Sequence, residues 1–239
     1  MIFSFSLLFF VTVLAPAIFW LWFFNWQDRA ELEPKKLLFK TFLLGIGICI
    51  LASVIETEII SKLLPEKITF FVKFAAIVLL PCFFEELLKY FTLREFIYRR
   101  TEFNQIADGI FYAITLALGF SVWENAQYFY GLAKRPDEIF VLIMILRGMA
   151  TMLLHITATG MVGYALGKKK FTPEHKKSIV VKALIFAILL HGLFNLSAFF
   201  SNGLNFAFPM VFLVFIYLLY SFKKTEAKII WKLSNPFKK

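Results

Sequence analysis

Two adjacent glutamates and a lysine stand inside an apolar stretch of the chain, in the segment Glu85-Glu86-Leu87-Leu88-Lys89. On a helix, Lys89 lies four residues from Glu85 and three from Glu86, so its ammonium can reach either carboxylate. Adjacent side chains point about 100° apart on a helix, so the two carboxylates can hold different partners. One glutamate can be ionised against Lys89 while the other exchanges protons as a general base. The alternative is an ion pair that serves only the structure.

A third carboxylate and another cation lie in the next two apolar stretches. Glu124 is followed by Asn125, whose amide can both donate and accept hydrogen bonds. Arg147 opens a row of residues at spacing four and can balance the charge of Glu124. We expect the threonines on either side of His155 in this row to orient its imidazole. The row consists of Arg147, Thr151, His155, Thr159 and Gly163.

Two histidines complete the set of chemically active residues. His155 shares a helix face with the buried Arg147, although a lone buried histidine is usually a hydrogen-bonded core residue. His191 and Asn195 are four apart, so Asn195 can orient the imidazole of His191 or hold a substrate carbonyl. The third histidine, His175, lies in a basic loop, and we give it no role in the site.

Membrane helices are the elements that must position these residues. The 239 residues are 60% hydrophobic, with a mean hydropathy of +0.74 and 32 phenylalanines. A run of about 20 apolar residues crosses the hydrocarbon core as a helix. The chain is expected to be all-α, a single integral membrane domain over residues 1–239, with its motifs at about 74–200 and a basic cytoplasmic tail at 223–239. We predict seven spans, at about 2–26, 41–60, 74–93, 107–131, 139–167, 178–200 and 205–222.

The distribution of basic residues predicts the orientation of these spans. Loops 27–40, 94–106 and 168–177 and the tail carry most of the lysines and arginines, and cytoplasmic loops collect such residues. The N-terminus is therefore predicted to face out and the C-terminus to face the cytoplasm. We attribute the net charge of +10 to this topology and not to nucleic-acid binding, which needs a basic face on a soluble domain. The tail is expected to lie on the anionic inner membrane surface.

Ionisable residues inside the predicted spans indicate where the functional site lies, because lipid is an unfavourable environment for them. An ionisable group inside a span costs at least ~2.5–3.5 kcal/mol, so such groups usually face the protein interior and pair with one another. Counted from the outer ends of the spans, Glu124 lies roughly 10 Å deep and His155 roughly 24 Å deep. Helix tilt, and a break in the helix near Pro81, would narrow this difference. We therefore expect the carboxylates and imidazoles to meet in one pocket.

Taken together, these segments resemble the PrsW family of intramembrane proteases. The resemblance runs in order from Pro81 to Asn195, about half of the chain. Its motifs are Glu85-Glu86-x-x-Lys89, Asp108-Gly109, Gly119-Phe120-x-x-x-Glu124-Asn125, His155 with its Thr and Gly neighbours, and His191-Gly192-x-x-Asn195. The family is distantly similar to the CAAX prenyl endopeptidases, in which an arginine takes the place of Lys89 and a histidine that of Glu124. The last motif often ends in Asp in the family, and here it ends in Asn195.

The resemblance implies an endopeptidase of the bacterial plasma membrane that cuts membrane-protein substrates in or near the bilayer. Its best-known task is site-1 cleavage of an anti-sigma factor. On this reading, Glu85 or Glu86 activates a water molecule held by His155 and His191. Glu124 is a further ligand or acid, and Asn125 or Asn195 steadies the oxyanion. Lys89 and Arg147 support the site, and the oligomeric state is left open.

The same residues allow a version of the reaction that uses a metal. His155, His191 and a carboxylate, here Glu124, would bind a divalent ion such as zinc and leave one position for water. The sequence has no His-Glu-x-x-His motif, so both the metal-dependent and the metal-free mechanism stay open. We expect no organic cofactor.

Two other classes of function are compatible with the buried polar residues. A proton-coupled membrane transporter also uses buried Glu, His, Lys and Arg, although no inverted repeat is visible in the sequence. A non-catalytic membrane scaffold would use the same residues to hold its helices together or to bind a partner.

Overall fold

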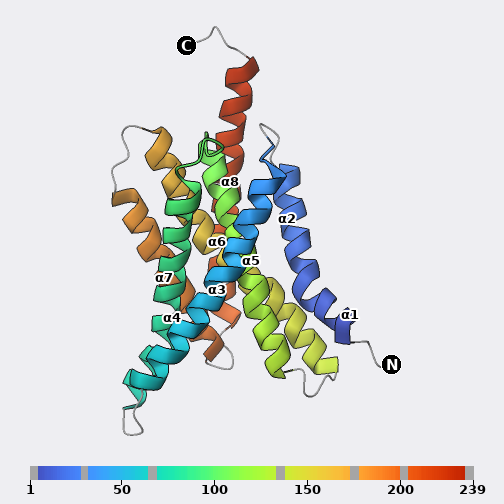
Figure 1. Cartoon of the computed structure of the whole chain (residues 1–239), viewed down its shortest axis with the longest axis vertical. Coiled ribbons are helices and arrows are strands. Elements are labelled where there is room, and N and C mark those ends of the chain that lie inside the picture. Colours follow the sequence, from blue (N-terminus) through green and yellow to red (C-terminus); the bar gives the residue numbers. More distant parts are fainter. Residues whose placement is uncertain are drawn as a thin grey trace.

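The structure is a computed structural model that describes residues 5–27, 32–63, 69–132, 138–172, 178–199 and 204–234. Within these ranges every regular element is a helix, as the sequence predicts for an all-α chain. The helices run roughly along the long axis of the molecule (Figure 1). A bilayer core offers the backbone no water to bond with, so helices that satisfy their own N–H and C=O groups are expected there.

Helices occupy all seven of the predicted spans. The first span is one helical rod made of α1, a π-helical segment (Phe10–Leu14) and α2. A second π-helical segment, Leu93–Ile97, follows α4. The bounds are α1 Phe5–Phe9, α2 Ala15–Gln27, α3 Lys35–Leu63, α4 Phe70–Thr92, α5 Ile106–Leu132, α6 Glu138–Phe171, α7 Ser178–Phe199 and α8 Leu204–Ser234.

Six helices in the described part of the chain are long and apolar enough to cross a membrane. They are Phe5–Gln27, Lys35–Ile59, Ile106–Gly131, Val141–Phe171, Ser178–Ser197 and Phe208–Lys228. These helices make the chain a polytopic membrane protein. The remaining predicted span coincides with α4, which packs against α3 and α7. The number of spans and the orientation of the termini stay predictions.

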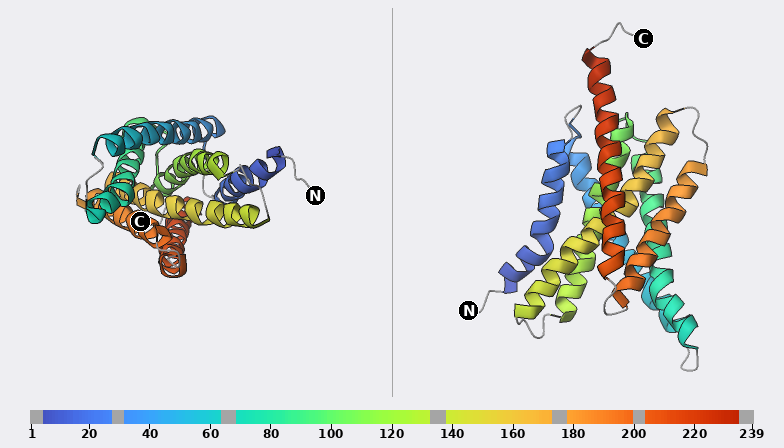
Figure 2. Two further views of the ribbon diagram at one scale, coloured as in Figure 1. Left: turned by 90° about the horizontal axis from the view of Figure 1, so that it is seen from below. Right: turned by 180° about the vertical axis from the view of Figure 1, so that it is seen from behind.

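The last predicted span continues further than the sequence suggests. We expected a basic tail lying along the membrane surface from residue 223 onward. Residues 223–234 prolong α8, whose end extends beyond the other helices (Figures 1 and 2), and the position of this tail relative to the membrane stays a prediction. Residues 235–239 lie outside the described part of the chain.

Helix α5 is the central element of the fold. Figure 2 shows it between α3 on one side and α6 on the other, and most of its membrane-spanning residues are buried. Glycines allow both close approaches. A Cβ built at Gly119 would lie 2.0 Å from the carbonyl oxygen of Phe42 on α3, and one at Gly163 would lie 2.0 Å from that of Gly109 on α5. Small residues of this kind let membrane helices pack backbone to backbone.

The contact between α3 and α5 leads to a first prediction, which uses two glycines two residues apart. A Cβ at Gly45 would lie 2.1 Å from the carbonyl oxygen of Leu116, whereas one at Gly47 would meet nothing within 4 Å. Gly45→Ala is expected to lower stability by about 1–3 kcal/mol, because the backbones must separate. Gly47→Ala is expected to leave stability unchanged or slightly raised. Equilibrium unfolding of the purified variants in mixed micelles measures both, and equal stabilities would contradict this account of the contact.

Asp108 stabilises the beginning of α5. Its Oδ2 accepts hydrogen bonds from the backbone N–H groups of Asn104 (2.7 Å) and Gln105 (2.8 Å), just ahead of the first turn. A carboxylate in the first turn that reaches back to these donors stabilises the start of a helix. Asp108 therefore anchors α5 at its first turn.

Candidate active site

Lys89 lies at the centre of a buried polar cluster formed by α4, α5, α6 and α7. Its side chain is fully buried, and its Nζ is 3.2 Å from Glu85 Oε2 and 2.9 Å from Glu86 Oε1. The third neighbour is His155 Nδ1, also at 2.9 Å. An ammonium has three N–H groups, so each can be donated to one of these acceptors. The sequence predicted the two glutamate contacts, but it gave no sign that Lys89 reaches His155.

These contacts fix the tautomer of His155. Because the Lys89 ammonium can only donate, Nδ1 of His155 must accept, and the ring proton is on Nε2. That nitrogen lies 2.8 Å from Glu124 Oε2, to which it donates. The ring of His155 is thus held between a cation on α4 and a carboxylate on α5.

The two adjacent glutamates have different surroundings. Glu86 is fully buried, and its Oε1 lies 3.0 Å from Nδ1 of His191 in addition to Lys89. Its other oxygen, Oε2, is buried and has no hydrogen-bond partner in the part of the chain that the structure describes. Glu85 is slightly exposed and borders a cavity. Both carboxylates contact Lys89, and Glu86 alone of the two is also within hydrogen-bond distance of His191.

His191 presents a free nitrogen next to Glu85. An ionised Glu86 can only accept, so the proton of His191 is on Nδ1 and its Nε2 keeps a lone pair. Nε2 lies 3.9 Å from Glu85 Oε2, a distance that one bridging water molecule suits better than a direct bond. The rings of His155 and His191 pack edge to face, with their centroids 4.9 Å apart.

Arg147 pairs with Glu124, as its place in the row of residues predicted. Its Nη2 is 3.0 Å from Glu124 Oε1, and its guanidinium lies 3.3 Å from the ring centroid of Tyr128. Glu124 therefore joins Arg147 to His155 through its two oxygens. The charge of each carboxylate in the cluster is met by a cation or by an imidazole N–H.

The expectation that threonine hydroxyls orient His155 is wrong. Thr151 donates to the backbone oxygen of Arg147 on its own helix (2.9 Å) and otherwise contacts Asn125. The hydroxyl of Thr159 has no hydrogen-bond partner among the described residues. A threonine inside a helix readily bonds the carbonyl four residues earlier, and this removes it from the imidazole.

The two asparagines have different partners. Asn125 is fully buried, with its amide bonded to Ser121 O and Thr151 Oγ1, so it joins α5 to α6. Asn195 does not bond to His191. It donates to the sulfur of Cys82 at 3.3 Å and borders the same cavity as Glu85. His175 lies outside the described residues.

A cavity of about 420 Å³ opens beside the cluster, between α3, α4, α5, α6 and α7. Its polar lining includes residues that the sequence analysis did not select, chiefly Glu56, Ser53 and Gln127. Glu56 is an acidic residue inside the predicted span 41–60, which is a signal that could have identified it. The lining is Cys49, Ala52, Ser53, Glu56, Val78, Pro81, Glu85, Phe120, Glu124, Gln127, Tyr128, Arg147 and Asn195.

Four residues of the cluster form a group that can bind a metal ion. Ligand atoms of Glu85, Glu86, His155 and His191 all lie within 4.8 Å of one another. Carboxylate and imidazole are suitable zinc ligands, and the unpartnered Oε2 of Glu86 is available. Glu124, the carboxylate ligand expected from the sequence, lies outside this group. The residues fit a metal in type, but Lys89 contacts three of the four, so its ammonium competes with the ion.

Comparisons with known proteins identify the family of the chain. The model of the family "PrsW family intramembrane metalloprotease" matches residues 33–220. The chain is 31% identical to the protease PrsW of Oceanobacillus iheyensis over 91% of this chain and 95% of the relative. It is 30% identical to that of Bacillus subtilis over 84% and 88%, and 29% identical to that of Halalkalibacterium halodurans over 80% and 82%. No solved structure matches the chain. The chain therefore belongs to the PrsW family of intramembrane metalloproteases and is a protease of the bacterial membrane.

Proposed function

We propose that this protease hydrolyses peptide bonds of membrane-protein substrates with Glu85 as the general base. The observation that carries the proposal is the position of Glu85 between the cavity and Nε2 of His191. A water molecule held by His191 Nε2 and Glu85 Oε2 would face a peptide in the cavity. Glu86 has no contact with the cavity, so its role is to hold His191 and Lys89 in place.

The proposed reaction uses groups that line the cavity or lie next to it. Glu85 accepts a proton from the water, whose oxygen attacks the peptide carbonyl carbon. Asn195 Nδ2, at the cavity wall, donates to the oxyanion that forms. The carbon–nitrogen bond then breaks, and Glu85 returns the proton to the leaving amine. His155, held by Glu124, keeps the Lys89 ammonium beside Glu85 and Glu86.

His155, His191 and one of the two glutamates would hold a divalent metal such as zinc. When bound, the metal would polarise the peptide carbonyl and favour the deprotonation of water. Because Lys89 contacts the same donor atoms, its side chain must turn away before they can bind the ion. Without a metal, Glu85 and His191 activate the water by themselves.

Metal analysis tests this part of the proposal. Purified wild-type chain is expected to bind about one zinc ion, and His155→Ala and His191→Ala are each expected to lose it. His175→Ala is the matched control and should bind as the wild type does. If the wild type binds no zinc and a chelator leaves cleavage unchanged, the reaction is the metal-free one.

We further propose that the substrate is a single-span membrane protein such as an anti-sigma factor, cut in a site-1-type cleavage. The support is the family to which the chain belongs and the depth of the cluster in the helix bundle. Co-expression with candidate single-span proteins tests this. A shortened product is expected with wild type and not with Glu85→Gln or Glu86→Gln. A product that persists with both variants would exclude hydrolysis by these glutamates.

A further inference from the structure

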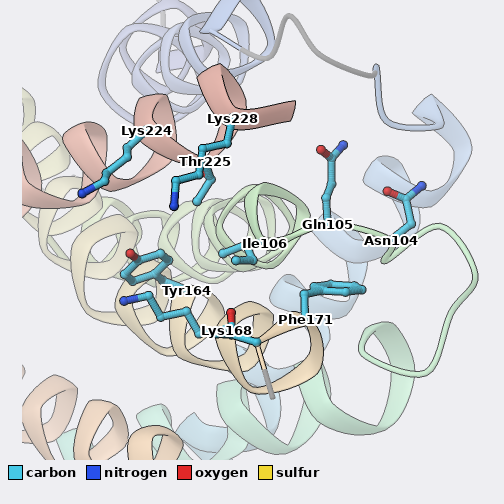
Figure 3. A pocket seen from close by; sticks show the side chains of 10 residues that line it. Asn104, Gln105, Ile106, Tyr164, Lys168, Phe171, Lys224, Thr225 and Lys228 are labelled. Carbon is cyan, nitrogen blue, oxygen red and sulfur yellow. The ribbon is translucent and has the colours of Figure 1, made fainter. Parts of the chain in front are cut away.

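A second cavity, of about 600 Å³, lies at one end of the bundle, away from the polar cluster. It is formed where α5 begins, where α6 ends and where the late part of α8 passes them (Figure 3). None of its residues borders the cavity beside Glu85. The lining is Asn104, Gln105, Ile106, Tyr164, Lys168, Phe171, Thr172, Lys224, Thr225 and Lys228.

Three lysines give this cavity a strong positive charge. Lys168 comes from α6, and Lys224 and Lys228 come from successive turns of α8. Figure 3 shows their ammonium groups on the same side of the cavity, with the hydroxyl of Tyr164 among them. The cavity lining contains no aspartate or glutamate, and none of the three lysines forms an ion pair within the described residues. An anion with several oxygens would find three donors there.

Gln105 requires a hydrogen-bond donor on the ligand, whereas the three lysines require acceptors. Its side chain is about nine-tenths buried at the edge of this cavity, and its Oε1 has no hydrogen-bond partner among the described residues. Figure 3 shows the amide projecting from the start of α5, with its oxygen on the side of α8. A buried acceptor without a donor is unfavourable. A simple anion would leave it unsatisfied, whereas a ligand that also carries a hydroxyl or amine would not.

We propose that this cavity binds a phosphate ester that carries a hydroxyl or amine near its phosphate. The three lysines and Tyr164 bind the phosphate oxygens, and Gln105 accepts the hydrogen bond from the second group. Ile106 and Phe171 provide an apolar wall for the carbon atoms between them. The headgroup of an anionic phospholipid has this chemistry, and so does a small free phosphate ester.

Binding to two probes tests the site and identifies the source of the ligand. The full-length protein is placed in phosphatidylcholine nanodiscs and titrated with phosphatidylglycerol or with glycerol 3-phosphate, and its thermal unfolding and bound lipid are measured. The variant Lys224→Gln/Lys228→Gln is expected to bind about ten- to thirty-fold more weakly. The matched control is Lys35→Gln/Lys36→Gln, which removes the same charge from exposed lysines at the start of α3.

Each outcome has a defined meaning. Binding of phosphatidylglycerol alone identifies a lipid headgroup site, and binding of glycerol 3-phosphate identifies a site for free phosphate esters. An equal loss in both double variants would mean attraction by the general surface charge and would overturn the proposal, as would no binding of either probe. Gln105→Leu gives a second check, since it keeps all three lysines but should still weaken binding. An unchanged affinity for this variant would overturn the role of the amide.

Discussion

Glu85→Gln is expected to lower the rate of peptide cleavage by roughly a hundred- to ten-thousand-fold, the range for loss of a general base. Glutamine has nearly the same shape as glutamate but cannot take a proton from water. The remaining cluster keeps its main contacts, because Lys89 still has Glu86 and His155 as acceptors. The fold should therefore survive. Cleavage of a co-reconstituted single-span substrate and thermal unfolding of the same preparation measure the two effects separately.

Glu86→Gln serves as the comparison within the same helix turn. This substitution replaces the fully buried carboxylate that bonds both Lys89 and His191, so it should lower stability as well as cleavage. Glu58→Gln, in an exposed pair with Lys62, should change neither. Near-normal cleavage by Glu85→Gln combined with inactive, stably folded Glu86→Gln would transfer the role of base to Glu86.

Lys89→Met is expected to destabilise the protein by about 3–5 kcal/mol, the cost of removing one partner from a buried ion pair. Methionine is unbranched like lysine and only one atom shorter, but two adjacent carboxylates lose their cation and His155 loses its donor. Equilibrium unfolding in mixed micelles measures the change. The matched control is Lys62→Met, which removes an exposed lysine from a similar i,i+4 pair and should cost less than about 1 kcal/mol.

A combined variant identifies the cause of this loss. Adding Glu85→Gln and Glu86→Gln to Lys89→Met removes the unbalanced charges, so at least half of the lost stability should return. If the triple variant is as unstable as Lys89→Met alone, the effect comes from packing against Phe120, whose ring centroid lies 3.8 Å from Nζ, and not from charge.

The sequence predicts the helices well because hydropathy decides them. It also identifies the residues that meet in the buried polar cluster, since charges inside apolar stretches are few. It does not predict their depth. Counting from the span ends separated Glu124 from His155 by more than 10 Å, yet their side chains are in contact. Helix α6 runs over 34 residues, longer than a bilayer core requires, so its predicted end was a poor origin for measuring depth.

The sequence also could not predict which residues on different helices contact one another. The pairing of Glu85 and Glu86 with Lys89 follows from spacing along one helix, whereas the bond from Lys89 to His155 joins α4 to α6 and depends on how they pack. The cavity that separates the roles of Glu85 and Glu86 is likewise formed by five helices. Local spacing contains no information about either feature.

The glycine contacts that hold α5 against α3 and α6 limit how the active site can open. With backbones this close, the three helices cannot slide or separate without losing their main interface. Glu124 and His155 therefore belong to a rigid half of the site, whereas Glu85, Glu86 and His191 stand on α4 and α7. Any motion that admits a polypeptide must then displace α4 or α7. Entry of the substrate would therefore change the distance between the proposed base, Glu85, and the water molecule that it activates.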